Sequence, residues 1–322
     1  MISFILFLCI ACTEEDHFLS DRETIVINTD AVEDIAEQDR WIYSQMKQNY
    51  LWADKLKDSL DCDYSLQPDI FFQELLVGED RFSYCVPNPE YEPSTKGTNL
   101  NETVKVDSIY SVGGKKVGYF YYSGFETKAD VTDVIIRMHG VDDLIVDVRN
   151  NPGGYVATCI YLASLIVPAE AKGQLFCSYE YNSRISRLNF EATGDEHTYS
   201  YFEDNALIAG RSLSLDRVYV LTGPHSASAS EMLINCLRPY MTVTVIGSIT
   251  TGKDVGMRLI SSRHCRYDLW PITFRTYNAD GIPVPVTGIV PDFLYEPEEV
   301  SGKLGDVSET LLSKALEEIY KK

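Results

Sequence analysis

Residues 143–154, DLIVDVRNNPGG, decide the fold of this chain. Their apolar part, 144–148, is the short run typical of a strand buried on both faces of a parallel sheet. A glycine-rich turn follows, and then a segment, 155–166, that predicts a helix. Strand 218–221, helix 228–237 and strand 243–246 repeat this order. Alternating strands and helices predict an α/β core.

Outward from this core, the predicted elements form a small set of segments. Toward the N-terminus, 104–109 and 117–122 predict strands and 130–138 a helix; toward the C-terminus, 308–320 predicts the last helix. Apolar residues recur at helical spacing over 30–52, and a second helix is predicted to begin at Pro68. Together these two helices predict a small N-terminal helical subdomain.

The predicted organisation has five parts. Residues 1–12 are expected to be a lipoprotein signal peptide, 13–29 an acidic tether and 30–85 the helical subdomain. The proline- and asparagine-rich residues 86–103 are expected to be a linker, and 104–322 the main domain.

The composition of the chain argues against some classes of binding partner. The 322 residues carry a formal net charge of −20. This charge argues against nucleic-acid binding and against a polybasic membrane patch, because both need a basic face. No run of 18 apolar residues occurs, so the sequence predicts no membrane-spanning helix.

The chain begins with a short apolar run, MISFILFLCIAC, followed by Thr13, Glu14, Glu15 and Asp16. A small residue before Cys12 is similar to a bacterial lipoprotein cleavage site, so Cys12 is the expected lipidation site. The alternative is an ordinary hydrophobic N-terminus, since no basic residue precedes the run. The expected location is the cell envelope, as an outer-membrane lipoprotein that is periplasmic or surface-exposed. The lipid anchor would be the only link to the membrane.

The other cysteines are scattered at 62, 85, 159, 177, 236 and 265, without a CxxC pair or an HExxH motif. They do not predict a metal site, and most are expected to be buried as small apolar side chains. Outside the cytoplasm, a disulfide among them is allowed.

Three motifs contain candidate catalytic residues. The first is LTGPHSASASE, 221–231, in which a strand ends, the chain turns and a helix begins. A serine in the first turn of that helix, such as Ser228, would lie beside free backbone N–H groups that favour a developing negative charge. The alternative is that Ser226, Ser228 and Ser230 only cap the helix.

The second motif is Thr250-Thr251-Gly252-Lys253, after the next strand, which returns the chain to the same sheet edge as Ser228. A buried lysine there can act as a base, because desolvation lowers its pKa; the alternative is a surface lysine. The third motif is Gly153-Gly154, where the lack of side chains would let backbone N–H groups approach a ligand closely. The alternative is an ordinary turn between a strand and a helix.

Together, DLIVDVRNNPGG, SASASEMLINCLRP and VTVIGSITTGK resemble the core blocks of the carboxyl-terminal processing peptidases, a serine–lysine protease family. The resemblance extends over most of the chain and includes WIYSQMKQNYLW, which looks like the N-terminal part of Bacteroidetes lipoprotein members. It implies a core related to the Clp protease and crotonase folds.

The resemblance also implies a Ser–Lys dyad of Ser228 and Lys253, whose spacing favours Ser228 over its neighbours. It implies Ala229 and Gly153 or Gly154 as oxyanion-hole donors. No metal or organic cofactor is implied.

The chain departs from this family in two ways. Residues 83–115 are too few for the PDZ domain that members usually have there, so this domain is expected to be absent or reduced. Met257 replaces a glutamine that orients the lysine in many members, which leaves Asp254 and Glu231 as the candidates for orienting it. None of the five histidines fits a Ser–His triad; His225 is expected to be structural or exposed.

The expected function is a serine endopeptidase that cleaves peptide bonds of exported proteins through an acyl-enzyme. The alternative is a catalytically weak or inactive peptide- or protein-binding lipoprotein on a protease fold. The sequence sets neither the substrate nor the oligomeric state.

Overall fold

The computed structural model describes residues 25–27, 34–89, 103–263 and 265–322. The predicted signal peptide, with Cys12, lies outside the described residues. So do most of the predicted tether and residues 90–102 of the predicted linker.

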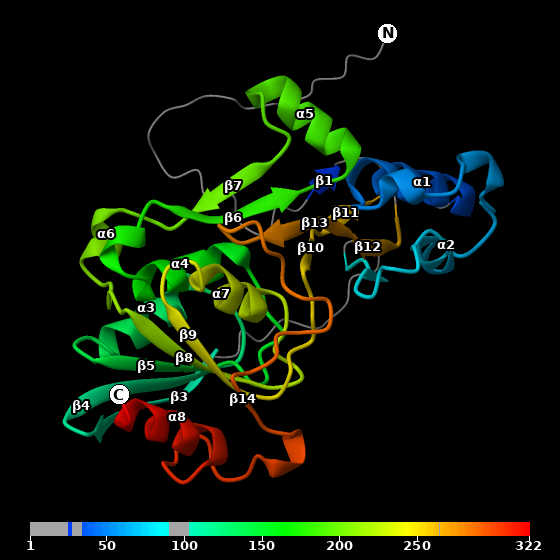
Figure 1. Cartoon of the computed structure of the whole chain (residues 1–322). Helices are drawn as coiled ribbons and strands as arrows, with labels where there is room; N and C mark the ends of the chain where they lie inside the picture. The colour runs from blue at the N-terminus through cyan, green and yellow to red at the C-terminus, as the bar shows by residue number, and fades with distance from the viewer. Residues whose placement is uncertain (1–24, 28–33, 90–102, 264) are drawn as a thin grey trace.

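A six-stranded sheet forms the centre of the molecule (Figure 1). Its strands follow the order β14-β9-β8-β5-β4-β3, and all neighbours are parallel except β3 and β4. The bounds are β3 Val104–Val112, β4 Lys115–Tyr122, β5 Asp143–Asp147, β8 Arg217–Thr222, β9 Thr242–Gly247 and β14 Phe293–Leu294. Every residue of β5 is buried, as its apolar run predicts.

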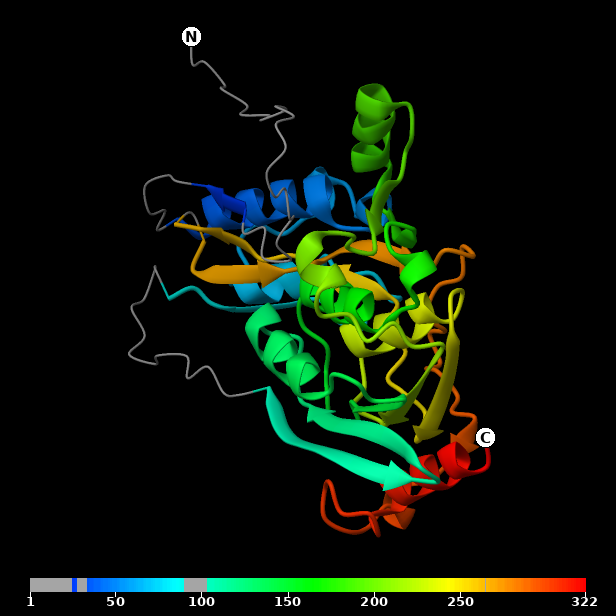
Figure 2. The ribbon, with the colours of Figure 1, turned by 90° about the vertical axis from the view of Figure 1, so that its left-hand side faces the viewer.

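Helices cover both faces of this sheet (Figures 1 and 2). Three lie on one face and one lies on the other: α3 Lys128–Arg137, α4 Val156–Ile166 and α7 Ala229–Leu237, then α8 Thr310–Tyr320. The alternation of side chains along β5 explains both layers. Val146 belongs to the larger hydrophobic cluster with α3, α4 and α7, whereas Ile145 packs in the cluster with α8.

A second sheet lies beside the first and has the order β10-β13-β6-β7. Its strands are β6 Leu175–Glu180, β7 Thr198–Tyr201, β10 Val255–Met257 and β13 Ile272–Tyr277, all antiparallel to their neighbours. Helix α5, Ser183–Thr193, joins β6 to β7 and stands out from the body of the molecule (Figure 2), while the short α6, Ala206–Ala209, follows β7. None of these elements was predicted from the sequence.

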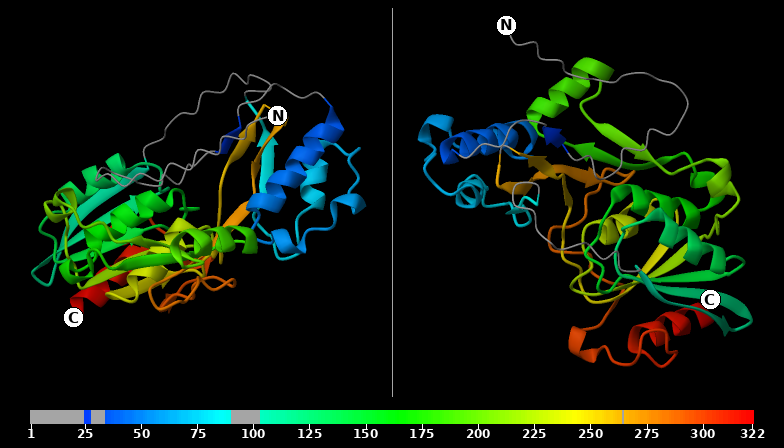
Figure 3. Two further views of the ribbon diagram at one scale, coloured as in Figure 1. Left: turned by 90° about the horizontal axis from the view of Figure 1, so that it is seen from above. Right: turned by 180° about the vertical axis from the view of Figure 1, so that it is seen from behind.

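The N-terminal subdomain contains helices α1, Ile35–Asn49, and α2, Pro68–Glu74, joined by the 3-10 turns η1, Ala53–Lys55, and η2, Ser59–Asp61. The remaining 3-10 turns are η3, Ala169–Ala171, and η4, Pro297–Glu299. A third sheet packs beside α1 and α2 (Figure 3): β1 Ile25–Ile27, β11 Ile260–Ser262, β12 Tyr267–Trp270 and β2 Tyr84–Pro87, in the order β1-β11-β12-β2. One hydrophobic cluster joins Met46 and Phe72 of the helices to Ile260 and Leu269 of this sheet. The subdomain and residues 255–272 therefore share a core.

The predicted α/β core with a small N-terminal helical subdomain is confirmed. Strand β1 lies within the segment predicted as a tether and pairs with β11. In the described part of the chain, no helix is long and apolar enough to cross a bilayer, and no group of acidic, histidine and cysteine side chains could hold a metal ion. No disulfide joins the six described cysteines, and four of the six are buried.

Candidate active site

Ser228 lies at the turn between β8 and α7, where it is the residue before the first helical position. Its backbone has φ 54° and ψ −115°, a conformation that non-glycine residues rarely adopt and that costs of the order of 1–3 kcal/mol. The side chain is half-buried and lines a cleft. This strained turn presents a serine hydroxyl to a cavity at the N-terminus of a helix.

The neighbouring serines have structural partners. Ser226 Oγ donates to Val148 O at 2.7 Å, and Ser230 Oγ donates to Asn151 O at 2.9 Å. Both side chains are fully buried, and both bonds hold the turn after β5 against the turn after β8. Of the three serines, Ser228 is the one that lines the cleft. His225 is exposed and does not line it.

Glu231 brings Ser228 and Lys253 together. Its carboxylate is fully buried in the first turn of α7, and one oxygen, Oε2, accepts the N–H of Ser228 at 3.0 Å and the N–H of Lys253 at 2.8 Å. The other oxygen accepts the N–H of Gly252 at 2.7 Å and the hydroxyl of Thr250. Four donors on one carboxylate fix the 250–253 segment against the helix that begins after Ser228.

The second candidate for orienting Lys253 has another partner. Asp254 is buried and forms an ion pair with Arg275, whose Nε lies 2.7 Å from Oδ2. Met257 lines the cleft and has no polar group that could orient an amine. Of the two sequence candidates, Glu231 is therefore the one that contacts Lys253, and it does so through the backbone.

The Lys253 side chain lines the same cleft as Ser228. Burial lowers its pKa to about 8, against the opposing effects of Glu231 and Asp80, so a useful fraction of the amine is neutral near pH 7. Its Nζ lies 5.3 Å from the centre of the Phe82 ring. Among the described residues, the Ser228 and Lys253 side chains line the same cleft without a hydrogen bond between them. In ligand-free enzymes, catalytic hydrogen bonds are often long and tighten only when substrate binds.

The predicted oxyanion donors differ in their availability. The Gly153 N–H donates to Asn151 Oδ1 at 2.9 Å, whereas Gly154 lines the cleft. Among the described residues, neither the Gly154 N–H nor the Ala229 N–H has an acceptor. Gly153 instead makes room for the nucleophile, because a Cβ at this position would lie 2.7 Å from the Ser228 Cβ. The structure therefore favours Gly154 and Ala229 as the pair of free donors.

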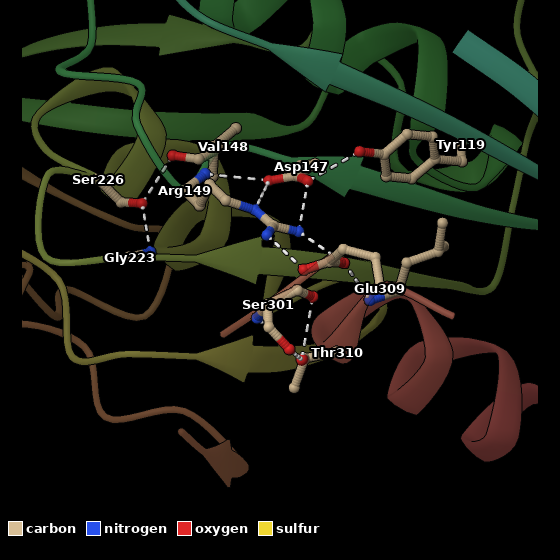
Figure 4. Close-up of polar contacts among 10 residues, drawn as sticks. Tyr119, Asp147, Val148, Arg149, Gly223, Ser226, Ser301, Glu309 and Thr310 are labelled. Atoms are coloured by element: carbon tan, nitrogen blue, oxygen red, sulfur yellow. Dashed lines mark hydrogen bonds and ion pairs between the residues drawn. The ribbon is translucent and has the colours of Figure 1, made fainter. Parts of the chain in front are cut away.

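A buried ionic network anchors the glycine turn (Figure 4). Arg149 donates to Asp147 Oδ1 at 2.9 Å and makes a bidentate contact with Glu309 at 2.6 and 3.0 Å. Tyr119 donates to the other Asp147 oxygen at 2.9 Å, and Glu309 also caps α8 by accepting the Leu312 N–H at 2.8 Å. The network thus ties the C-terminal helix to the end of β5, directly before the turn that carries Gly154.

The cleft has a volume of about 570 Å³. Residues of the second and third sheets and of α4 line it, together with the segments that follow β5, β8 and β9. Eight of its lining residues are aromatic: Tyr84, Tyr155, Tyr179, Tyr181, Tyr199, Tyr201, Trp270 and Phe274. Arg258 also lines it, with its guanidinium 5.8 Å from the Tyr181 ring centre. Such a wall suits a partly apolar ligand.

The sequence reasoning missed Asp80, Arg81 and Phe82. Arg81 Nη2 donates to Gly252 O at 2.6 Å, next to Lys253, although more than 170 residues separate the two in the chain. No local sequence pattern marks this contact, because it depends on how the subdomain packs.

Curated relatives match part of the chain. A carboxyl-terminal-processing protease of Synechocystis sp. is 31% identical over 146 residues, which are 44% of this chain and 29% of the relative. A Staphylococcus aureus protein named Probable CtpA-like serine protease is 26% identical over 158 residues, 48% of this chain and 28% of the relative. The matched part thus spans less than a third of the length of these relatives.

A solved structure matches nearly the whole chain. An S41 protease from Bacteroides fragilis has a TM-score of 0.75 at 22% identity, and the match covers 87% of this chain and 97% of that one. This likeness confirms the predicted fold class, an α/β core of the Clp protease and crotonase type with a helical N-terminal region.

Family models match two segments. The model described as Peptidase S41 N-terminal domain matches residues 37–84, and the model described as Peptidase family S41 matches residues 116–294. The second match alone covers more than half of the chain and contains the glycine turn, Ser228 and Lys253. The chain belongs to peptidase family S41.

Proposed function

We propose that this protein is a serine endopeptidase that uses Ser228 as nucleophile and Lys253 as general base. The observation that supports this most directly is the buried Glu231 carboxylate, which accepts the N–H groups of both residues on one oxygen. Family membership and the protease relatives point to the same reaction class.

The proposed reaction follows from the site. Neutral Lys253 Nζ takes the proton of Ser228 Oγ, and the oxygen attacks a peptide carbonyl in the cleft. The N–H groups of Ala229 and Gly154 stabilise the oxyanion of the tetrahedral intermediate. The Lys253 ammonium then protonates the leaving amine, and an acyl-enzyme remains on Ser228. Lys253 next removes a proton from water, which hydrolyses the ester. No step requires a metal or an organic cofactor.

We propose exported proteins or peptides as substrates. The volume and the aromatic lining of the cleft are compatible with a peptide segment that carries apolar side chains. Preference for carboxyl-terminal segments is an extrapolation from the name of the Synechocystis relative. We do not expect nucleic acid to bind, because the chain is strongly acidic.

The test compares the purified protein with its Ser228→Ala and Lys253→Ala variants on a denatured protein mixture, with new termini read by mass spectrometry. We expect new termini from wild type alone, and the cleavage sites then define the specificity. Cleavage by Ser228→Ala at the wild-type rate would exclude the mechanism. Circular dichroism of all three proteins controls for folding.

The alternative proposal is a weakly active or inactive peptide-binding protein. It is supported by Met257, which replaces a polar orienting group, and by the lack of a hydrogen bond between the two dyad side chains. A fluorophosphonate probe separates the two proposals. Stoichiometric labelling at Ser228 excludes an inert serine, whereas absent labelling with tight binding of denatured peptides supports the alternative.

We also propose a cell-envelope location through lipidation of Cys12, of the Bacteroidetes lipoprotein type, and the absence or reduction of a PDZ domain. The support is the sequence alone, MISFILFLCIAC followed by acidic residues, and the short 83–115 segment. Metabolic labelling with a palmitate analogue tests the anchor: incorporation is expected in wild type and lost in Cys12→Ser. Labelling of both proteins would assign the lipid to another residue.

A further inference from the structure

We infer that the segment Asp80–Phe82 of the N-terminal subdomain forms part of the active site. In this segment, Arg81 positions the backbone that precedes Lys253, and Phe82 covers the ammonium group of Lys253. This inference rests on the proposed function, since it treats Lys253 as the base. It assigns positioning residues to a subdomain that supplies neither the nucleophile nor the base.

The first contact is made by Arg81. Its Nη2 donates to the carbonyl oxygen of Gly252 at 2.6 Å and to that of Val286 at 3.2 Å. Gly252 directly precedes Lys253, has φ +78° and packs against the backbone of residue 286. The guanidinium therefore joins two backbone segments that meet behind the base. A charged donor on a carbonyl makes a stronger bond than a neutral one.

The second contact is made by Phe82. Its half-buried ring lies 5.3 Å from Lys253 Nζ and 4.8 Å from the Arg81 guanidinium carbon. A ring in this place has two opposing effects. Its bulk excludes water and disfavours the charged amine, while its face attracts a cation. Burial has the larger effect on Lys253, whose pKa is lowered to about 8.

The segment is itself rigidly held. Asp80 Oδ1 accepts the N–H groups of Phe82 and Ser83, each at 2.9 Å, and Asp80 Oδ2 accepts the hydroxyl of Tyr50 at 2.8 Å. Tyr50 is fully buried at the end of α1, and Ser83 Oγ accepts the Ile272 N–H of β13 at 2.8 Å. The position of Phe82 over the base is therefore fixed from both the helical subdomain and the second sheet.

Charged groups approach Lys253 from several elements. Glu231 on α7 and Asp80 before β2 both raise its pKa. Arg81 lies beside Phe82, and Glu126 and Arg258 line the same cleft. A variant that removes only the cover should therefore shift the Lys253 titration upward, because water then stabilises the charged amine.

The test measures the titration of Lys253 without requiring catalysis. The purified full chain, in a Ser228→Ala background, is trace-labelled with acetic anhydride across pH 6–11, and Lys253 acetylation is read by mass spectrometry against a free amine standard. The midpoint of the pH curve is compared, since access alone changes only the plateau. For the parent protein, the expected midpoint is about 8.

Phe82→Ala is expected to raise the midpoint by one pH unit or more. Phe82→Leu, which keeps the apolar cover and loses the aromatic face, is expected to stay at or below the parent midpoint. Arg81→Met is expected to raise the midpoint because the segment loosens, and Arg81→Lys is expected to restore part of the change. Parent midpoints in both Phe82→Ala and Arg81→Met would overturn the inference.

Asp80→Asn is a second variant in case the others do not fold, because the asparagine oxygen can still accept the N–H groups of Phe82 and Ser83. Removal of the charge is expected to lower the midpoint, and an unchanged midpoint would show that this segment does not face Lys253. The separate cleavage assay distinguishes the two proposals. Cleavage without titration shifts refutes this inference alone, whereas shifts without cleavage by wild type refute the proposed function alone.

Discussion

Replacement of Glu231 by glutamine tests the centre of the site. The carboxylate accepts two donors on each oxygen. A glutamine retains one oxygen, which can face Ser228 and Lys253. Its NH2 group then faces the Thr250 hydroxyl, which can accept, and the Gly252 N–H, which cannot. One buried N–H is left without an acceptor, which costs about 1–3 kcal/mol, and the remaining hydrogen bonds are weaker because their acceptor is no longer charged. Removal of a buried charge offsets part of this cost, so we expect the free energy of unfolding to fall by about 2–3 kcal/mol.

The same substitution also changes the pKa of Lys253. The Glu231 charge raises the pKa of Lys253, against the larger lowering by burial. Without that charge, the Lys253 pKa should fall below about 8. More of the amine is then neutral near pH 7, even though the fold is weaker. A purely structural role of Glu231 would not shift the pH midpoint downward.

Urea unfolding followed by circular dichroism gives the stability change, and fluorophosphonate labelling of Ser228 against pH gives the midpoint. Glu299→Gln is the matched control, because Glu299 is also the third residue of a helical turn and accepts the N–H of Glu296 at 2.8 Å, but is exposed. We expect a loss below about 1 kcal/mol there and no midpoint shift. A Glu231→Gln midpoint at or above that of wild type would refute the electrostatic argument, and unchanged stability would refute the hydrogen-bond argument.

Three further predictions concern the base, the glycine turn and the buried network. Cleavage by wild type should rise with pH to a midpoint near 8, since only neutral Lys253 is a base; a midpoint near 6.5, typical of histidine, would contradict this. Gly153→Ala should abolish cleavage and lower the melting temperature more than Gly194→Ala, which has a similar positive φ but open space around it; equal effects would contradict the contact argument. Arg149→Met should cost about 3–5 kcal/mol in urea unfolding, because it leaves buried carboxylates unpaired, against below about 1 kcal/mol for the more exposed pair broken in Arg137→Met. Similar losses in the two variants would contradict it.

The sequence predicted five of the six strands of the central sheet because their signals are local, whereas the two-residue strand β14 was not predicted. Strand β5 is an unbroken apolar run, and the turns after β5 and β8 are marked by glycine and serine. The rule that parallel strands end at one edge then placed the turn with Ser228 and the segment with Lys253 together. Ser228 and Lys253 line one cleft, which agrees with that reasoning.

The second sheet could not be predicted in the same way. Strand β6 pairs with β13, almost a hundred residues later, and β10 has only three residues. Short strands with such distant partners have no local periodicity to separate them from loops. Helix α5, which contains no buried residue, was not predicted either. The aromatic wall of the cleft therefore became apparent only in three dimensions.

The choice between Glu231 and Asp254 shows what separates sequence from structure at the site itself. Both carboxylates lie near the dyad in the sequence, and Asp254 is adjacent to Lys253. Adjacent residues of an extended segment point to opposite sides, however, and Asp254 pairs with Arg275. Glu231 lies on another element, but the first turn of a helix aims its carboxylate at the free N–H groups there. The preference of an acidic residue for the first turn of a helix can be applied to the sequence alone. The contact of Glu231 with the backbone of residues 252 and 253 cannot, because it forms only when the chain returns through β9 to that end of the helix.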